Sequence, residues 1–178
     1  MRAWLAIFLL GIAGVAQGQR TEATEASLKA AYLFKFASYV EWTASDFDSP
    51  AAPLSIGVVG ADDVATELTR LVGGRNIAGH PVAVKRFSEG EAPRGVQMLF
   101  VGHDTARLGA IARAAQSQGV LVVTDTEHGL EMGAAINFVA VGERLGFEVS
   151  LDSAEKSGHR ISSRMLNVAK RVVQKGAV

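Results

Sequence analysis

Short apolar runs that alternate with helical stretches constrain the fold of this chain most. Four such runs stand in order: LSIGVVG (54–60), HPVAVKRF (80–87), VQMLFVG (96–102) and VLVVTD (120–125). Near-continuous Val and Leu runs separated by helices are typical of a mostly parallel sheet that is covered on both faces. We therefore expect a three-layer α/β fold with a mostly parallel sheet of about six strands, a C-terminal antiparallel hairpin and about five flanking helices.

The segments between these runs have the apolar spacing of helices. In residues 61–74, apolar side chains recur at steps of three and four, Asp62 or Asp63 can cap the start, and Gly73 ends the pattern. Residues 106–119 repeat the helical spacing. Each of these segments is expected to be a helix that crosses over between two strands.

The pattern changes after the fourth run. AINFVAVGERLGFEVSL (135–151) alternates apolar and polar residues, and Gly142 with Glu143 can form a tight turn in its middle. We expect an antiparallel hairpin here. In ISSRMLNVAKRVV (161–173), apolar residues recur at helical spacing, which predicts a C-terminal helix.

The segment KAAYLFKFASYVEWT (29–43) is rich in aromatic residues, although these make up only 7% of the chain. Its rings belong to Tyr32, Phe34, Phe36, Tyr39 and Trp42. Helical spacing of the apolar residues predicts a helix from Glu25 to Trp42, with Thr24 as its N-cap. Charged residues such as Lys29 fall off the apolar stripe, so we expect the rings to dock the helix onto the sheet.

The N-terminal residues resemble an export signal. Residues 1–18 carry Arg2, an apolar run and then the small-residue pattern Ala16, Gln17, Gly18. This predicts a signal peptide that is cleaved near Gly18. A membrane anchor is the alternative, but the apolar run is short for a bilayer span. The remaining chain is expected to comprise a short linker (19–24), one α/β domain (25–174) and a tail (175–178), located in the periplasm.

Composition narrows the function further. The 178 residues include 18 basic and 18 acidic side chains, so no net charge favours nucleic acid or an anionic membrane. Cysteine is absent, which excludes disulfides, thiol catalysis and cysteine metal sites. The four histidines lack the spacing of a zinc site, and GVVGADD lacks the third glycine of a dinucleotide fingerprint. We expect no metal site and no cofactor.

Polar residues follow the third and fourth apolar runs. His103 and Asp104 follow one run, and Thr124 and Asp125 close the other. The carboxyl ends of parallel strands are where α/β proteins bind ligands, so a hydrolase that uses His103 or Asp125 is one hypothesis. The sequence has no nucleophile-elbow motif to supply its serine. The simpler interpretation is that these residues cap the following turns.

A second polar cluster stands in SGHRISSR (157–164). His159, Arg160, Ser162 and Arg164, with the backbone N–H groups of a helix start, can hold a carboxylate or phosphate. This predicts a small-anion site and a receptor function as an alternative. In the simpler interpretation the serines cap the helix and the arginines lie in water.

Several segments together resemble the YfiR family. They are KAAYLFKFASYVEW, LSIGVVG, LFVG, VLVVTD, INFVAVGERLGFEVSLDSAEKSG and RISSRMLNVAK, in the family's order, over about residues 25–173. The resemblance implies a non-catalytic periplasmic regulator, typically a homodimer, that acts on the periplasmic domain of an inner-membrane diguanylate cyclase or sensor kinase. It implies a role in cyclic di-GMP signalling and biofilm formation.

Two features depart from the family pattern. Relatives often carry paired cysteines that form disulfides, whereas this chain has none, so redox control of its fold is excluded. The usual proline after YVEW is Thr43 here, which affects only the way the helix ends. If the first helix carries more rings than the sheet can bury, Phe34 and Trp42 are the candidates for an apolar surface that binds a partner.

Overall fold

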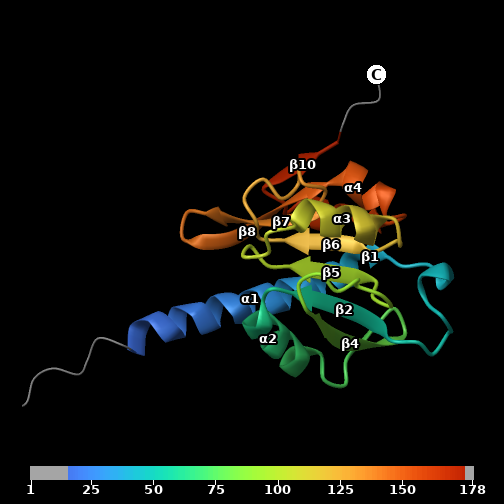
Figure 1. The fold of residues 1–178 in the computed structure, drawn as a ribbon, viewed down its shortest axis with the longest axis horizontal. Helices are drawn as coiled ribbons and strands as arrows, with labels where there is room; N and C mark the ends of the chain where they lie inside the picture. The colour runs from blue at the N-terminus through green and yellow to red at the C-terminus, as the bar shows by residue number, and fades with distance from the viewer. Residues whose placement is uncertain (1–15, 175–178) are drawn as a thin grey trace, which may run out of the picture.

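The protein is a three-layer α/β structure, as the sequence predicts (Figure 1). The computed structural model describes the backbone of residues 16–174 and the side chains of residues 25–174. Helices α1 (Ala16–Tyr39) and α2 (Asp62–Val72) pack against each other, and α2 also packs on the sheet. Helix α3 (Leu108–Gln116) lies on the other face of the sheet. There it packs with the strand side chains that point to that face, in a second core cluster.

An eight-stranded sheet forms the middle layer, with the order β10-β8-β7-β6-β5-β2-β4-β3. Its strands are β2 (Leu54–Val59), β3 (Asn76–Ile77), β4 (His80–Phe87), β5 (Met98–Val101), β6 (Leu121–Thr124), β7 (Ile136–Val141), β8 (Arg144–Ser150) and β10 (Arg171–Val173). The pairs β2–β4, β2–β5, β5–β6, β6–β7 and β8–β10 are parallel, whereas β3–β4 and β7–β8 are antiparallel. The four predicted apolar runs are therefore confirmed as parallel strands.

Strand β2 lies at the point where the chain changes direction across the sheet. Ile56 pairs with Val84 of β4 on one side and with Met98 of β5 on the other. Helix α2 and the short strand β3 connect β2 to β4, and α3 connects β5 to β6 beyond the other side of β2. In such sheets, ligand sites favour the carboxyl ends of the strands near this point.

The hairpin of β7 and β8 also matches the prediction. Val141 pairs with Arg144, and Gly142 in the turn has φ of 62°, a conformation that glycine adopts without strain. Phe138 and Phe147 face each other across the hairpin. Their rings pack against Phe36 of α1, with centroid separations of 5.5 and 4.9 Å. This aromatic cluster docks the first helix, as its apolar stripe predicts.

Some helix ends differ from the predictions. Helix α1 begins at Ala16, so Thr24 lies inside it and is not an N-cap. The residues expected to be a linker (19–24) have helical backbone. Ala61, rather than Asp62 or Asp63, is the N-cap of α2, because both acidic residues lie in its first turn. There they favour the positive end of the helix dipole.

The C-terminal segment is not the predicted helix. It forms β9 (Arg160–Ile161), the short helix α5 (Ser163–Leu166) and β10. Strand β9 pairs with β1 (Val40–Glu41), and β10 adds a parallel strand beside β8. Val168, expected on the buried side of a helix, is 71% exposed. The pairing of β10 with β8 therefore overrides the helical spacing of the sequence.

Two smaller elements complete the fold. The 3-10 helix η1 (Ala44–Asp46) follows β1, and α4 (Leu151–Lys156) follows β8. The predicted signal peptide lies largely outside the described residues, and its cleavage stays a prediction. Among residues 16–174, none of the helices combines the length and apolar character that a membrane span requires.

Candidate functional site

The carboxyl ends of β5 and β6 bring together two residues that the sequence singles out. His103 follows β5, and Asp125 follows β6. The Nδ1 atom of His103 lies 3.3 Å from Oδ2 of Asp125, whose side chain is 8% exposed. Because β5 and β6 are parallel neighbours, their following residues meet at one edge of the sheet. The structure therefore brings His103 and Asp125, which the sequence places after separate strands, together at this edge.

Lys29 of α1 completes this cluster and was not anticipated. Its Nζ lies 2.7 Å from Oδ2 of Asp125 and 2.8 Å from Oε1 of Glu25, one helical turn earlier. Lys29 is only 8% exposed, although its place off the apolar stripe predicts a solvated side chain. The i,i+4 spacing of Glu25 and Lys29 is the one signal in the sequence that favours an ordered lysine.

The lysine stays charged in this setting. Burial alone lowers the pKa of Lys29, but hydrogen bonds to Asp125 and Glu25, together with their negative charges, outweigh burial and raise the pKa above its ordinary value. The Lys29–Asp125 contact joins segments that are 96 residues apart. It therefore ties α1 to the carboxyl edge of the sheet.

The chemistry of this cluster favours a structural tie over turnover. The polar contacts of His103 in the described structure are to two carboxylates, Asp104 and Asp125. The hydroxyl of Thr124 donates to the carbonyl of Val101 at 2.7 Å. The serine that the hydrolase hypothesis needs is not among the described contacts of His103, so nothing at this edge supports that hypothesis.

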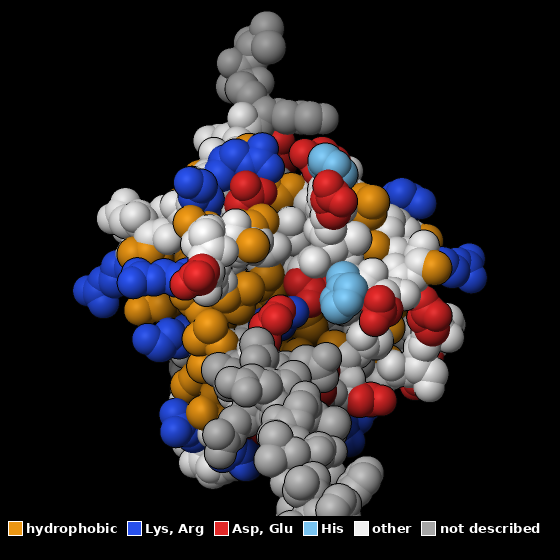
Figure 2. Space-filling view, turned by 90° about the vertical axis from the view of Figure 1, so that its left-hand side faces the viewer, with side chains coloured by type: hydrophobic (Ala, Val, Ile, Leu, Met, Phe, Trp, Pro, Cys, Tyr) orange, Lys and Arg blue, Asp and Glu red, His pale blue; other side chains and the backbone are white. Residues whose placement is uncertain are grey.

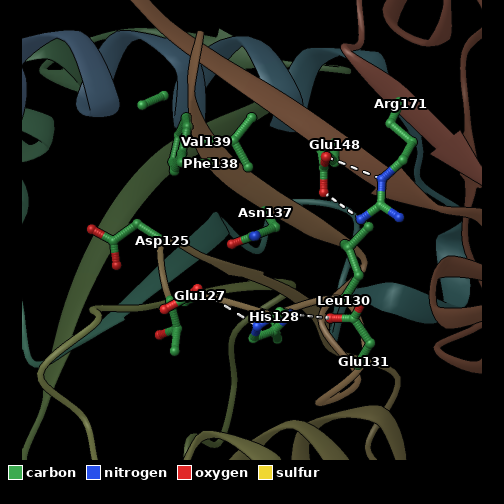
Figure 3. Close-up of a pocket in the computed structure, with 12 residues that line it drawn as sticks. Asp125, Glu127, His128, Leu130, Glu131, Asn137, Phe138, Val139, Glu148 and Arg171 are labelled. Carbon is green, nitrogen blue, oxygen red and sulfur yellow. Dashed lines mark hydrogen bonds and ion pairs between the residues drawn. The ribbon is translucent and has the colours of Figure 1, made fainter. Parts of the chain in front are cut away.

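A cavity of about 330 Å³ lies beside Asp125 (Figure 3). The segment after β6 forms one wall, with Glu127, His128 and Glu131, and the hairpin forms the other, with Asn137 and Glu148. Arg171 of β10 closes the far side. Figure 2 views the molecule from this end, where acidic and histidine side chains gather around a hollow. No local pattern in the sequence predicts this cavity, because its lining comes from separate segments between Asp125 and Arg171 that only the fold brings together.

A second ionisable pair lies at the opposite end of the sheet. His159 is 1% exposed, with Nε2 at 3.4 Å from Oδ1 of Asp46 and Nδ1 at 3.3 Å from Oγ of Ser157. The ring of Trp42 packs edge-on against it, with centroids 4.8 Å apart. Burial lowers the pKa of His159, and the nearby negative charge of Asp46 only partly opposes this. His159 is therefore a neutral core residue near pH 7.

The residues of the predicted anion site do not converge. His159 contacts Asp46 and Ser157 in the interior, whereas Arg160 in β9 and Arg164 in α5 are exposed. Ser162 caps α5 by accepting a hydrogen bond from the backbone N–H of Arg164, as in the simpler interpretation. The anion site stays an untested prediction.

The two aromatic residues predicted to bind a partner are half-buried. Phe34 lies on α1 beneath Arg75, whose guanidinium carbon is 5.4 Å from the ring centroid. The indole N–H of Trp42 donates to the carbonyl of Ala37 at 2.7 Å. Both rings also pack against the core, so each has a structural role besides any role at an interface. Across the described part of the chain, no three His, Asp or Glu residues are placed to hold a metal ion.

Solved structures share the fold. A conserved domain protein from Vibrio cholerae O1 biovar El Tor superposes with a TM-score of 0.56 at 14% identity, covering 83% of this chain and 60% of that one. The ABC domain from Streptococcus pneumoniae, solved in complex with L-Trp, gives a TM-score of 0.50 at 11% identity, covering 67% and 55%. The chain thus spans less than two thirds of either structure, and at these identities the likeness concerns the fold alone.

No curated protein matches the sequence. The family comparison gives a match over most of the chain, at residues 26–170, to the model described as YfiR/HmsC-like. The matched region begins in α1, next to the residues of the Lys29 cluster, and ends just before β10. This chain therefore belongs to the YfiR/HmsC-like family.

Proposed function

We propose that this protein is an exported, non-catalytic regulator that acts on the periplasmic domain of an inner-membrane signalling enzyme. The observation that carries the proposal is the family match over residues 26–170. A diguanylate cyclase is the preferred partner and a sensor kinase the alternative, because these are the partners that the family resemblance implies. The output is then the cellular level of cyclic di-GMP.

The site geometry supports a binding role. At the carboxyl edge, where α/β enzymes place their reactive groups, the buried Asp125 is engaged by Lys29 in an ion pair. A carboxylate held in this way stabilises the arrangement of α1 and the sheet. A regulator needs a stable shape that a partner recognises, and such ties between elements supply it.

The proposed partner surface includes Phe34 and Trp42. Phe34 lies near a shallow hollow of about 210 Å³ between α1 and α2, which is lined by Ala30, Arg70 and Arg75 among others. Half-buried aromatic residues beside arginines are typical of the energetic centres of protein interfaces. A partner that covers Phe34 would gain apolar contact without unfolding α1.

Co-expression with the candidate partner tests this function. The chain is produced together with a candidate inner-membrane diguanylate cyclase, and cyclic di-GMP is measured together with co-purification of the enzyme's periplasmic domain. We expect capture of that domain and a lowered cyclic di-GMP level. Unchanged cyclic di-GMP and no capture, from a chain shown to be exported and folded, would contradict the proposal.

A pair of variants tests the surface. Phe34→Ala should reduce capture by about tenfold if the ring is central to the interface. Lys35→Ala, an exposed change at the next position of α1, is the matched control. Melting temperatures are measured for both variants. Lost stability with intact capture would assign Phe34 a purely structural role.

A further inference from the structure

Charge is distributed unevenly along this neutral chain. Residues 156–178 contain six basic side chains and no acidic one, although the whole chain has 18 of each kind. Residues 1–155 therefore hold 12 basic and 18 acidic side chains, so a positive C-terminal segment is balanced by a negative remainder. A protein of zero net charge can thus present one positive surface, which an anionic partner meets first.

The positive segment lies at one margin of the fold. Strand β10 is the last strand of the sheet, beside β8, and Figure 1 shows β10 and α4 together at the top of the molecule. Its backbone is anchored, because the N–H of Lys170 donates to the carbonyl of Phe147 at 2.8 Å. Met165 of α5 is 1% exposed. The outward side chains of this segment therefore lie on an ordered surface.

Most basic side chains of this segment are free of ion pairs. Within residues 25–174, four of them are exposed and have no ion pair: Lys156, Arg160, Arg164 and Lys170. Arg171 is different, since Glu148 holds it through hydrogen bonds of 3.0 and 2.7 Å. Glu41 lies opposite Arg160 in the β1–β9 pair, and α4 carries acidic residues beside Lys156. Arg164 and Lys170 are therefore the centre of the positive surface.

An exposed apolar side chain lies between these two basic residues. Val168 follows α5 and is 71% exposed, the highest fraction among the large apolar side chains that the structure describes. Val172 of β10 is 40% exposed. Proteins that bind to a membrane surface combine such groups, because apolar side chains enter the acyl boundary while Lys and Arg stay among the phosphates.

We propose that the segment from Arg160 to Val172 is a docking surface for an anionic lipid bilayer. A bilayer suits this arrangement because it offers phosphates to the spread basic side chains and an apolar layer to Val168, whereas a small anion offers only the first. The inference goes beyond the regulatory function, since binding to lipid requires no protein partner. It would hold the exported protein next to a membrane enzyme.

Co-sedimentation with lipid vesicles tests this inference. The mature chain is mixed at low salt with vesicles of equal parts phosphatidylglycerol and phosphatidylcholine, and separately with vesicles of phosphatidylcholine alone. We expect binding to the anionic vesicles only, and release at high salt because exposed charges are screened. Each basic side chain near an anionic surface should strengthen binding by about fivefold.

Two variants test the location. Arg164→Gln combined with Lys170→Gln should weaken vesicle binding by about 25-fold. Val168→Ser should weaken it by about threefold. These side chains are exposed, so the melting temperature of each variant should match that of the wild type. Arg94→Gln combined with Arg113→Gln removes two exposed basic residues elsewhere and is the matched control, which should bind nearly as well as the wild type.

Several results would overturn the inference. Equal binding to both kinds of vesicle, or no binding to the anionic ones, would show that the positive surface does not recognise anionic lipid. Equal losses in the two arginine-containing double variants would mean that net charge attracts the vesicles. Loss of capture of the enzyme's periplasmic domain in the Arg164→Gln, Lys170→Gln variant, without vesicle binding by the wild type, would assign the surface to an acidic protein.

Discussion

An ionisable pair is buried at each end of the mostly parallel sheet, and the pKa of the basic residue changes in opposite directions in the two pairs. At the carboxyl end, Lys29 and Asp125 lie 2.7 Å apart and Glu25 adds a second acceptor. At the amino end, His159 and Asp46 lie 3.4 Å apart. The pKa of Lys29 is raised, whereas the pKa of His159 is lowered.

The difference lies in the number and closeness of the partners. Burial lowers the pKa of both basic groups, so the outcome depends on whether hydrogen bonds and opposite charges exceed that effect. Two carboxylates close to Lys29 exceed it, while one more distant carboxylate near His159 does not. The ion pairs of Lys29 with Asp125 and Glu25, called the charged tie below, therefore stabilise the carboxyl end. Packing around the neutral ring of His159 stabilises the amino end.

Breaking the charged tie should have the largest effect. Asp125→Ala leaves Lys29 buried without its closest partner, which should lower the free energy of unfolding by about 3 kcal/mol. Chemical denaturation of the purified chain measures this. Lys29→Met combined with Asp125→Leu should recover most of the loss, since no buried charge remains. A double variant as unstable as Asp125→Ala would mean that the loss comes from packing.

Removing the packing at the other end should have a smaller effect. Trp42→Ala deletes the ring that covers His159 and the hydrogen bond to Ala37, which should cost about 2 kcal/mol of unfolding free energy. Trp42→Phe keeps a ring and should cost about 1 kcal/mol. Thermal and chemical unfolding of both variants test the order. Equal stability of the wild type and Trp42→Ala would show that packing of Trp42 around His159 does not stabilise the amino end.

The neutral state of His159 predicts a pH dependence. Because its pKa is lower in the folded state than the ordinary value of 6.5, the unfolded chain binds more protons between these two values. The wild type should lose stability relative to His159→Phe as pH falls below about 6.5 toward the folded-state pKa. Above that range the difference between the two should stay constant. Parallel stability curves from pH 7.5 to 5 would contradict a neutral, buried histidine.

The smallest effect should come from the outer acceptor of the charged tie. Glu25 is more than half exposed, so Glu25→Gln should change the free energy of unfolding by about 0.5 kcal/mol. Added salt should reduce even this difference, since water and ions screen the exposed carboxylate. A loss as large as that of Asp125→Ala would mean that Glu25, rather than Asp125, holds Lys29.

Regular patterns in the sequence predict the frame of the molecule well. The four apolar runs are strands, the hairpin turns at Gly142, and Phe36 docks α1 as expected. These features depend on local spacing and on turn chemistry, which a single sequence displays directly. The position of Asp125 and His103 at one edge also follows, because parallel strands align their carboxyl ends.

Features that depend on distant pairing are not visible in the sequence. Residues 161–173 have helical spacing, yet Arg171–Val173 form a strand that pairs with β8. The sequence predicts that Lys29 is solvated, but in the fold Lys29 contacts Asp125, which is 96 residues away. The sequence predicts that His159 belongs to a small-anion site, although in the fold it is buried beside Trp42 and Asp46. In each case a tertiary neighbour determines the state of the residue.

The sheet ends in two very short strands, β3 with two residues and β10 with three. Strand β3 covers only His80 and Pro81 of β4, so residues 82–87 form a longer open margin, where the charged and exposed Lys85 and Arg86 oppose the addition of another chain. Growth into fibres by strand addition is thereby disfavoured.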